Sequence, residues 1–291
     1  MSAASSGMSP AAALSHRLSG LAGIQFIKKL DDQMDDVSAQ KIFAEKLQTI
    51  HEKIMAAPRQ FLLVSEADVN AQLQQDIEAI WPQQSAAGSF KALSPAPVQQ
   101  QIKQAWLTST QVNFCAKAYV TVASQHADAA PLNVLGGFMR NGFLHRAIRE
   151  QGGAYGGGAG NDSANACFRF YSYRDPRLAE TLHDFDAAIE WMLSSKHTEQ
   201  QLEEAILGVI SGIDKPGSPA GEAKQAFHNE LYGRTAAQRR ESRARILQVS
   251  LKDLTRVTEQ YLHQKPASVA VITSANKEAA VKDLQLEIKQ L

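Results

Sequence analysis

"FLHRAIREQGGAYGGG", residues 143–158, places one tyrosine between two groups of glycines. The apolar residues at its start follow helical spacing, and the helix is expected to end near Arg149. Gly152 and Gly153 then suit the left-handed cap of a helix C-terminus. This cap accounts for two of the five glycines around Tyr155. A strand without side chains lets another backbone approach closely, so the other glycines predict a strand edge to which an extended peptide could add.

The segments beside this stretch predict a long helix followed by a β-hairpin. The helix begins near Leu132 and carries its apolar residues on one face. Strands are expected at 153–159 and 165–173, joined by a turn at "NDSA". Phe168 and Phe170 alternate with polar residues in the second strand, which is typical of a strand with one buried face.

The rest of the chain mixes helices with isolated strands. The strongest strand signal is "TQVNFCAKAYVTVAS", residues 110–124, which is rich in valine and aromatic residues. The other expected elements are strands at 59–68 and 267–274, two helices within 21–56 separated by "LDDQMDD", a helix at 69–81, a long surface excursion at 83–109, four or five helices between 176 and 262, and a terminal helix at 277–291. Because the strands and helices do not alternate regularly, the sequence predicts an α+β fold: a mainly antiparallel sheet covered by helices and preceded by a helical arm.

Two domains are expected. Pro58 ends the helical arm, so residues 1–57 are predicted to be the end of a preceding domain or a linker, and residues 58–291 a C-terminal α+β domain. The first 20 residues are small and polar and lack a continuous apolar segment. They predict a linker and not a signal peptide or a membrane span.

Composition argues against nucleic-acid and membrane partners. Thirty basic and thirty acidic side chains cancel among 291 residues, so no overall charge draws the chain to either. The basic run at 234–245 contains no aromatic residue that could stack on bases, and a solvated helix face explains it better. Cys115 and Cys167 lie in apolar runs without metal-binding spacing. Both are predicted to be free thiols in an intracellular soluble protein.

The sequence carries no complete catalytic motif of its own. The glycine loop follows a helix and precedes a hairpin, the reverse of a phosphate-binding loop, which disfavours a nucleotide-binding protein. "HEKIM", residues 51–55, begins like the H-E-x-x-H of zinc proteases, but Met55 replaces the second histidine. The inverted motif H-x-x-E-H occurs nowhere among the eight histidines, and no G-x-S-x-G is present.

The opening stretch resembles the C-terminal half of the pitrilysin or insulin-degrading-enzyme family of zinc peptidases, and most specifically its presequence-protease branch. In that branch a helix ending in Arg precedes Gly-Gly-Ala-Tyr-Gly. The resemblance continues through "HRLSGLAGIQFIKKL" near the start, the strand at 110–120, and "KPGSPAGEA" at 215–223. It implies an enzyme of two halves, each with two related α+β domains, which enclose a chamber for unfolded peptides.

The resemblance also implies roles for single residues. Arg149 and Tyr155 would reach across to the substrate, supported by the loop of Gly152, Gly153 and Gly156. Zinc would be held by the N-terminal half, through an inverted motif whose Glu is the general base. This chain is therefore expected to hold no metal, to be inactive alone, and to have that catalytic half as its partner. The location implied in a eukaryote is an organelle, either mitochondrion or plastid.

The predicted function is thus the substrate-binding, chamber-closing and non-catalytic part of a zinc metalloendopeptidase that degrades short unstructured peptides. The alternative is an inactive peptidase-like scaffold or partner-binding subunit. The intact pair of Arg149 and Tyr155 favours the first reading, since a scaffold has no need of it.

Overall fold

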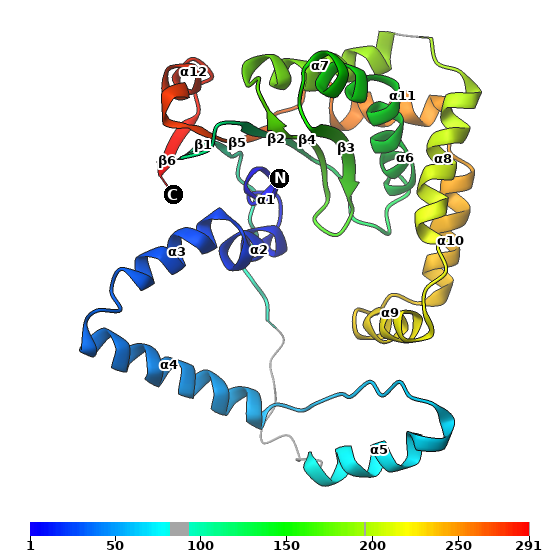
Figure 1. Ribbon diagram of the computed structural model, residues 1–291. Coiled ribbons are helices and arrows are strands. Elements are labelled where there is room, and N and C mark those ends of the chain that lie inside the picture. Colours follow the sequence, from blue (N-terminus) through cyan, green and yellow to red (C-terminus); the bar gives the residue numbers. More distant parts are fainter. Residues whose placement is uncertain (82–92, 195, 291) are drawn as a thin grey trace. The chain divides into compact units, whose positions relative to one another are not determined.

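The structure, a computed structural model, describes residues 1–81, 93–194 and 196–290 (Figure 1). The chain divides into two compact units. Unit 1 comprises Met1–Phe26, Pro95–Lys215 and Ala237–Leu291, and unit 2 comprises Ile27–Ser94 and Pro216–Ala236. The predicted domain boundary at residue 57 separates the C-terminal domain from a domain that would precede it, so the boundary stays a prediction.

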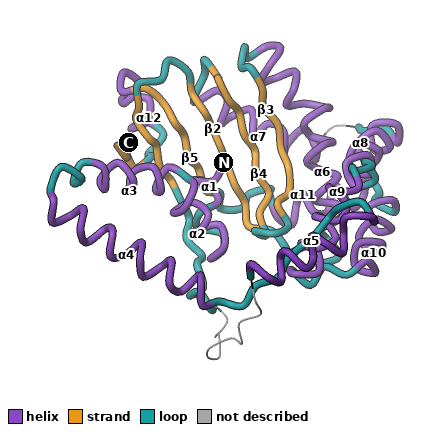
Figure 2. Tube along the Cα trace, turned by 60° about the horizontal axis from the view of Figure 1, so that its bottom comes forward, coloured by secondary structure: helices purple, strands orange, loops and turns teal. Residues whose placement is uncertain are grey.

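Unit 1 is built on one six-stranded sheet (Figure 2). The strand order is β3-β4-β2-β5-β1-β6. The strands are β1 (Lys103–Thr108), β2 (Asn113–Val120), β3 (Gly156–Asp162), β4 (Cys167–Asp175), β5 (Ser268–Ser274) and β6 (Glu287–Gln290). The pairs β3–β4, β4–β2 and β2–β5 are antiparallel, whereas β1 runs parallel to both β5 and β6. The predicted α+β class is confirmed, with a sheet that is antiparallel on one side and parallel on the other.

The predicted helix and hairpin around the glycine stretch are both present. α6 (Ala129–Met139) continues into η1 (Arg140–Gln151), which is wound as a π-helix. β3 and β4 then pair from Gly156 opposite Tyr173 to Asp162 opposite Cys167. A π-helix is wider than an α-helix and is frequently found at functional sites. Here it leads directly into the glycines.

Helices cover one face of the sheet; α6 and α7 (Ala179–Ser194) contribute more buried core residues than the other helices do, and α11 (Leu251–Tyr261) also packs into the core. Phe168 and Phe170 of β4 meet edge to face, and Phe170 stacks on Phe185 of α7 at a centroid separation of 5.6 Å. All three rings are fully buried. Burying such rings removes a large apolar area from water, which is the main stabilising contribution of the core.

A short helix, α1 (Ser2–Ser5), lies on the opposite face of the sheet (Figure 1). Its Ala3 and Ala4 pack against Ala116 and Ala118 of β2 and Ala270 of β5. Small side chains on both sides allow this close approach. The expectation of a linker over the first 20 residues was therefore wrong, because a composition of small residues also suits a helix that lies directly on a sheet.

The other helices mostly follow the sequence pattern. They are α2 (Pro10–Ser19), α3 (Leu21–Asp31), α4 (Val37–Ala56), α5 (Ala67–Ile80), α8 (Glu199–Ile213), α9 (Pro219–Leu231), α10 (Ala236–Leu247), η2 (Ala275–Lys277) and α12 (Glu278–Asp283). The break between α3 and α4 falls at "LDDQMDD" as predicted. Five helices, α7 to α11, occupy the region between 176 and 262.

Three predicted elements differ from the structure. Within the strand expected at 59–68, residues 59–66 are irregular backbone with Phe61, Leu62 and Val64 exposed, and residues 67–68 begin α5. The predicted excursion at 83–109 lies partly outside the described residues and contains β1. The predicted terminal helix is short, and β6 follows it. A strand needs a partner, and the apolar run at 59–68 has no strand of the described chain beside it.

Candidate functional site

Arg149 lies in the last turn of η1, and its side chain is exposed. Its guanidinium makes no hydrogen bond or ion pair with the described residues. Its backbone carbonyl accepts from the Gly153 N–H at 3.1 Å, and the Ile148 carbonyl accepts from the Ala154 N–H at 3.1 Å. Gly153 has φ 76°, so the left-handed cap expected at the end of this helix is confirmed at that residue.

The glycines of β3 let the preceding helix lie close to the strand. A Cβ on Gly157 would lie 2.8 Å from Ile148 Cγ2 and 3.0 Å from the Tyr171 carbonyl oxygen. A Cβ on Gly136 of α6 would lie only 2.6 Å from the Gly160 Cα. Packing of the strand against α6 and η1 thus gives these glycines a reason beyond an open edge for a peptide.

Tyr155 follows the cap and is 59% exposed. Its N–H donates to the Arg174 carbonyl oxygen at 3.2 Å, which extends the β3–β4 pairing by one residue. Its ring meets Tyr173 edge to face at a centroid separation of 5.5 Å, and the Arg174 guanidinium carbon lies 5.6 Å from the same ring centroid. Tyr173 and Arg174 were not predicted as site residues.

β3 is the last strand on its side of the sheet. None of the described strands pairs with its outer edge, so the edge can offer backbone N–H and C=O groups to an extended peptide. Gly156 stands at the start of this strand, next to Tyr155. The structure thus places one exposed phenol at the beginning of an edge strand.

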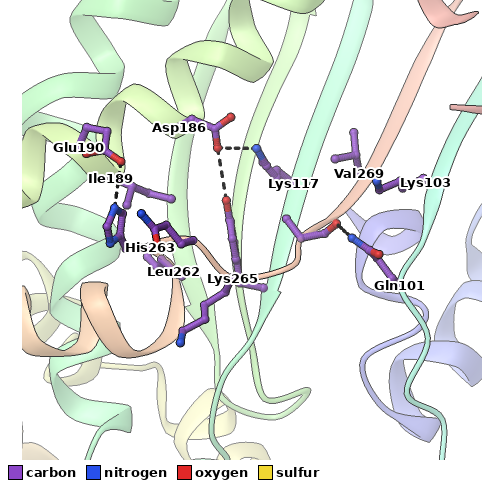
Figure 3. A pocket seen from close by; sticks show the side chains of 13 residues that line it. Gln101, Lys103, Lys117, Asp186, Ile189, Glu190, Leu262, His263, Lys265 and Val269 are labelled. Carbon is purple, nitrogen blue, oxygen red and sulfur yellow. Dashed lines mark hydrogen bonds and ion pairs between the residues drawn. The ribbon is translucent and has the colours of Figure 1, made fainter. Parts of the chain in front are cut away.

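A polar cavity of about 380 Å³ lies on the helical face of the sheet (Figure 3). Lys117 Nζ donates to Asp186 Oδ1 at 2.5 Å, and the Tyr119 hydroxyl donates to the same oxygen at 3.4 Å. His263 Nε2 lies 3.4 Å from Glu190 Oε1. Burial, with Asp186 beside it, raises the pKa of Tyr119 well above its usual range. Each carboxylate therefore has a nitrogen neighbour within the cavity, and neither Arg149 nor Tyr155 lines it.

An apolar cavity of about 450 Å³ lies on the other face of the sheet, beside α1. Its aromatic and aliphatic lining includes Trp106, Phe114, Tyr171, Tyr173 and Ile272. The Trp106 indole N–H finds no acceptor among the described residues. Because Tyr173 also contacts the ring of Tyr155, the aromatic surface at Tyr155 continues into this cavity.

The described residues contain no group of three or more His, Cys, Asp or Glu side chains that could hold a metal ion. His51 and Met55 of "HEKIM" both lie on α4 and are exposed. Cys115 and Cys167 are buried free thiols, as predicted. None of the helices in the described ranges combines the length and the apolar character needed to cross a bilayer.

Comparison with known proteins identifies the same branch of peptidases that the glycine stretch resembles. The family described as "PreP C-terminal domain" matches residues 103–275. The mitochondrial presequence protease of Kluyveromyces lactis is 32% identical over 268 residues, which cover 89% of this chain and 27% of that protein. The mitochondrial presequence protease of Danio rerio is 31% identical over 300 residues, which cover 95% of this chain and 29% of that protein. The chain thus spans less than a third of the length of these relatives.

Two solved structures share the fold. Pitrilysin aligns with a TM-score of 0.56 and 12% identity over 76% of this chain and 25% of that one. A peptidase M16 inactive domain from Pseudomonas fluorescens aligns with a TM-score of 0.51 and 15% identity over 78% of this chain and 53% of that one.

Proposed function

This chain belongs to the PreP C-terminal domain family, and we propose that it is the substrate-binding, chamber-closing and non-catalytic part of a zinc metalloendopeptidase that degrades short unstructured peptides. The observation that carries the proposal is Tyr155, an exposed phenol held at the start of the glycine-rich edge strand β3. Arg149, without a partner in the described chain, ends the helix just before it.

The two side chains have different roles in the proposed reaction. Peptide hydrolysis passes through a tetrahedral intermediate whose oxygen carries developing negative charge, and the Tyr155 hydroxyl would donate to that oxygen. Gly156, Gly157 and Gly158 beside it carry no side chain that would block a peptide. The Arg149 guanidinium would hold a main-chain carbonyl of the substrate, through a charge-assisted hydrogen bond that already exists before the transition state. Gly152, Gly153 and Gly156 would hold the loop that presents both groups.

Zinc would supply the Lewis-acid chemistry of the complete enzyme. The described residues of this chain do not fit a zinc site, because no three ligand-type side chains come together in them. The proposal therefore places the metal in an N-terminal catalytic half, outside this chain. In that longer enzyme, residues 58–291 would be the last domain, and the helical arm of residues 1–57 would join it to the preceding domain, with the first helix of the arm packed on the sheet of the last domain.

The exposed face of α4 supports a partner within the same enzyme. Its apolar residues recur at helical spacing, yet none of the residues of α4 is buried. Ile42, Leu47, Ile50 and Ile54 are each at least half exposed. An apolar face of this kind is typical of a surface that another part of the protein covers. The relatives named above are mitochondrial, which supports a mitochondrial location if this chain is eukaryotic.

The test is to assay Tyr155→Phe and Arg149→Ala in the full enzyme, or with the zinc half added in trans. Tyr155→Phe should lower kcat by about 10²–10³, the usual loss for one oxyanion donor. Arg149→Ala should raise KM by roughly 10- to 100-fold, which corresponds to a charge-assisted hydrogen bond of about 1.5–3 kcal/mol. It should raise KM at least as clearly as it lowers kcat.

Two control variants match these changes. Tyr232→Phe removes the hydroxyl of another exposed tyrosine, which also has an arginine over its ring. Arg146→Ala removes an exposed arginine three residues from Arg149 on the same helix. Both controls should keep wild-type kinetics. Wild-type turnover in Tyr155→Phe and Arg149→Ala would refute the proposal and favour the scaffold.

A further inference from the structure

The β4 strand contains a bulge directly opposite Tyr155. Cys115 of β2 pairs with Ser172, but Asn113 pairs with Asp175. Two residues of β4, Tyr173 and Arg174, therefore stand opposite the single residue Phe114 of β2. Such an extra residue bends a strand and changes the direction of its side chains, and bulges are frequent beside active sites.

The bulge brings two consecutive side chains onto one ring. Consecutive residues of a regular strand point to opposite faces of the sheet. Here Tyr173 lies at 5.5 Å and the Arg174 guanidinium carbon at 5.6 Å from the centroid of the Tyr155 ring. The Arg174 guanidinium makes no hydrogen bond or ion pair with any described residue, so this ring is its partner.

Arg174 adopts a backbone conformation that favours glycine. Its φ is 49°, in the left-handed region. The other non-glycine residues with positive φ in the described ranges, Ala166, Gln264 and Gln285, all lie in turns. An unfavourable conformation within a strand persists where the surrounding structure holds it, and such conformations cluster at functional sites. Glycine would suit this backbone and would remove the contact with Tyr155.

We propose that Arg174 is a positioning residue: the bulge turns its guanidinium onto the ring of Tyr155, and together with Tyr173 it fixes the direction of the phenol hydroxyl. This inference rests on the proposed role of Tyr155 in substrate binding. A cation over an aromatic face attracts the ring, and a ring held between two neighbours presents its hydroxyl at one place. A freely rotating exposed tyrosine would not.

The decisive variant is Arg174→Gly, because it removes the side chain and relieves the backbone. Ala166→Gly is the matched control, since Ala166 has φ 50° in the turn of the same hairpin. Neither variant should lower the thermal stability of the chain. In the chain itself, with its tyrosines labelled with ¹³C, Arg174→Gly should shift the ring signals of Tyr155, whereas Ala166→Gly should not. Tyr155→Phe assigns those signals.

In the full enzyme, Arg174→Gly should lower kcat by about two- to fivefold, the equivalent of one exposed cation–π contact, with KM nearly unchanged. Arg174→Lys keeps the cation and should recover part of the loss. In the Tyr155→Phe background, Arg174→Gly should have no further effect on kcat.

Unchanged ring signals of Tyr155 in Arg174→Gly would overturn the inference, whatever the activity. An equal loss of kcat with and without the Tyr155 hydroxyl would overturn it as well. Wild-type turnover in Tyr155→Phe would refute the proposed function instead, and shifted ring signals would still support the contact.

Discussion

Alanine substitutions at Gly136 and Gly137 of α6 test whether this helix and the strand β3 are in backbone contact. An alanine Cβ at Gly136 would lie 2.6 Å from the Gly160 Cα and 3.0 Å from the Ala159 carbonyl oxygen, both in the backbone of β3. A Cβ at Gly137 would meet nothing within 4 Å. The two positions are adjacent in one helix, so they differ mainly in this contact.

The expected changes in the free energy of unfolding have opposite signs. Replacing glycine by alanine within a helix stabilises by roughly 0.5–1 kcal/mol, and Gly137→Ala should gain this amount. Gly136→Ala gains the same helix propensity, but forcing a methyl group against backbone costs about 1–3 kcal/mol. Gly136→Ala should therefore destabilise, and the two variants should differ by about 1–3 kcal/mol.

Equilibrium unfolding in urea, followed by circular dichroism, measures both variants against the unsubstituted chain. In thermal unfolding, each kcal/mol should shift Tm by about 2–4 °C for a unit of this size. If Gly136→Ala stabilises the protein as much as Gly137→Ala does, helix and strand are not in backbone contact. The packing explanation of the glycines would then be wrong.

Other predictions concern metal binding, pH and the exposed helix face. The isolated chain should hold no stoichiometric zinc and cleave no peptide; one tightly held zinc per chain by elemental analysis after dialysis would contradict this. Burial raises the pKa of Cys115 to about 12 from an ordinary value of 9.0, so its stabilising contribution is complete below pH 9 and is lost as pH rises toward about 12. When the pH is raised from about 8 to about 10.5, the urea midpoint should decrease less in Cys115→Ala than in the unsubstituted chain. An equal decrease in both proteins would show that this thiol is not responsible. Ile50→Glu on α4 should weaken association with the zinc half, measured by titration calorimetry, whereas Gln48→Glu on the other side of the helix should not; equal binding of both would exclude this face from the interface.

Local signals in the sequence were enough to predict the hairpin and the helix cap. Gly153 adopts a positive φ because its immediate neighbours end a helix, and the glycine pair shows this without knowledge of the fold. The alternation in β4 likewise identifies the buried side of Phe168 and Phe170. In each case the determining residues lie within a few positions of one another.

Elements that depend on distant partners could not be predicted in this way. β1 is a short run in which four consecutive residues are buried, and it pairs with strands near the end of the chain. The position of Arg174 beside Tyr155 depends on the register between β2 and β4. This register cannot be read from the sequence of either strand alone. The run at 59–68 has strand-like composition but no partner in the described chain.

The pairing of β1 with β5 also determines when unit 1 can fold. Ile102 and Ser268, which are joined by a hydrogen bond at the start of this pairing, are 166 residues apart in the chain. During synthesis β1 leaves the ribosome well before its neighbours β5 and β6, which lie far along the chain from it. Contacts between such distant segments form slowly, because the entropy of closing the loop must be overcome first. The hairpin of β3 and β4 can form as soon as both strands are made, whereas both edges of β1 stay unprotected until β5 and β6 have been synthesised, and such an exposed edge is prone to wrong pairing during that interval.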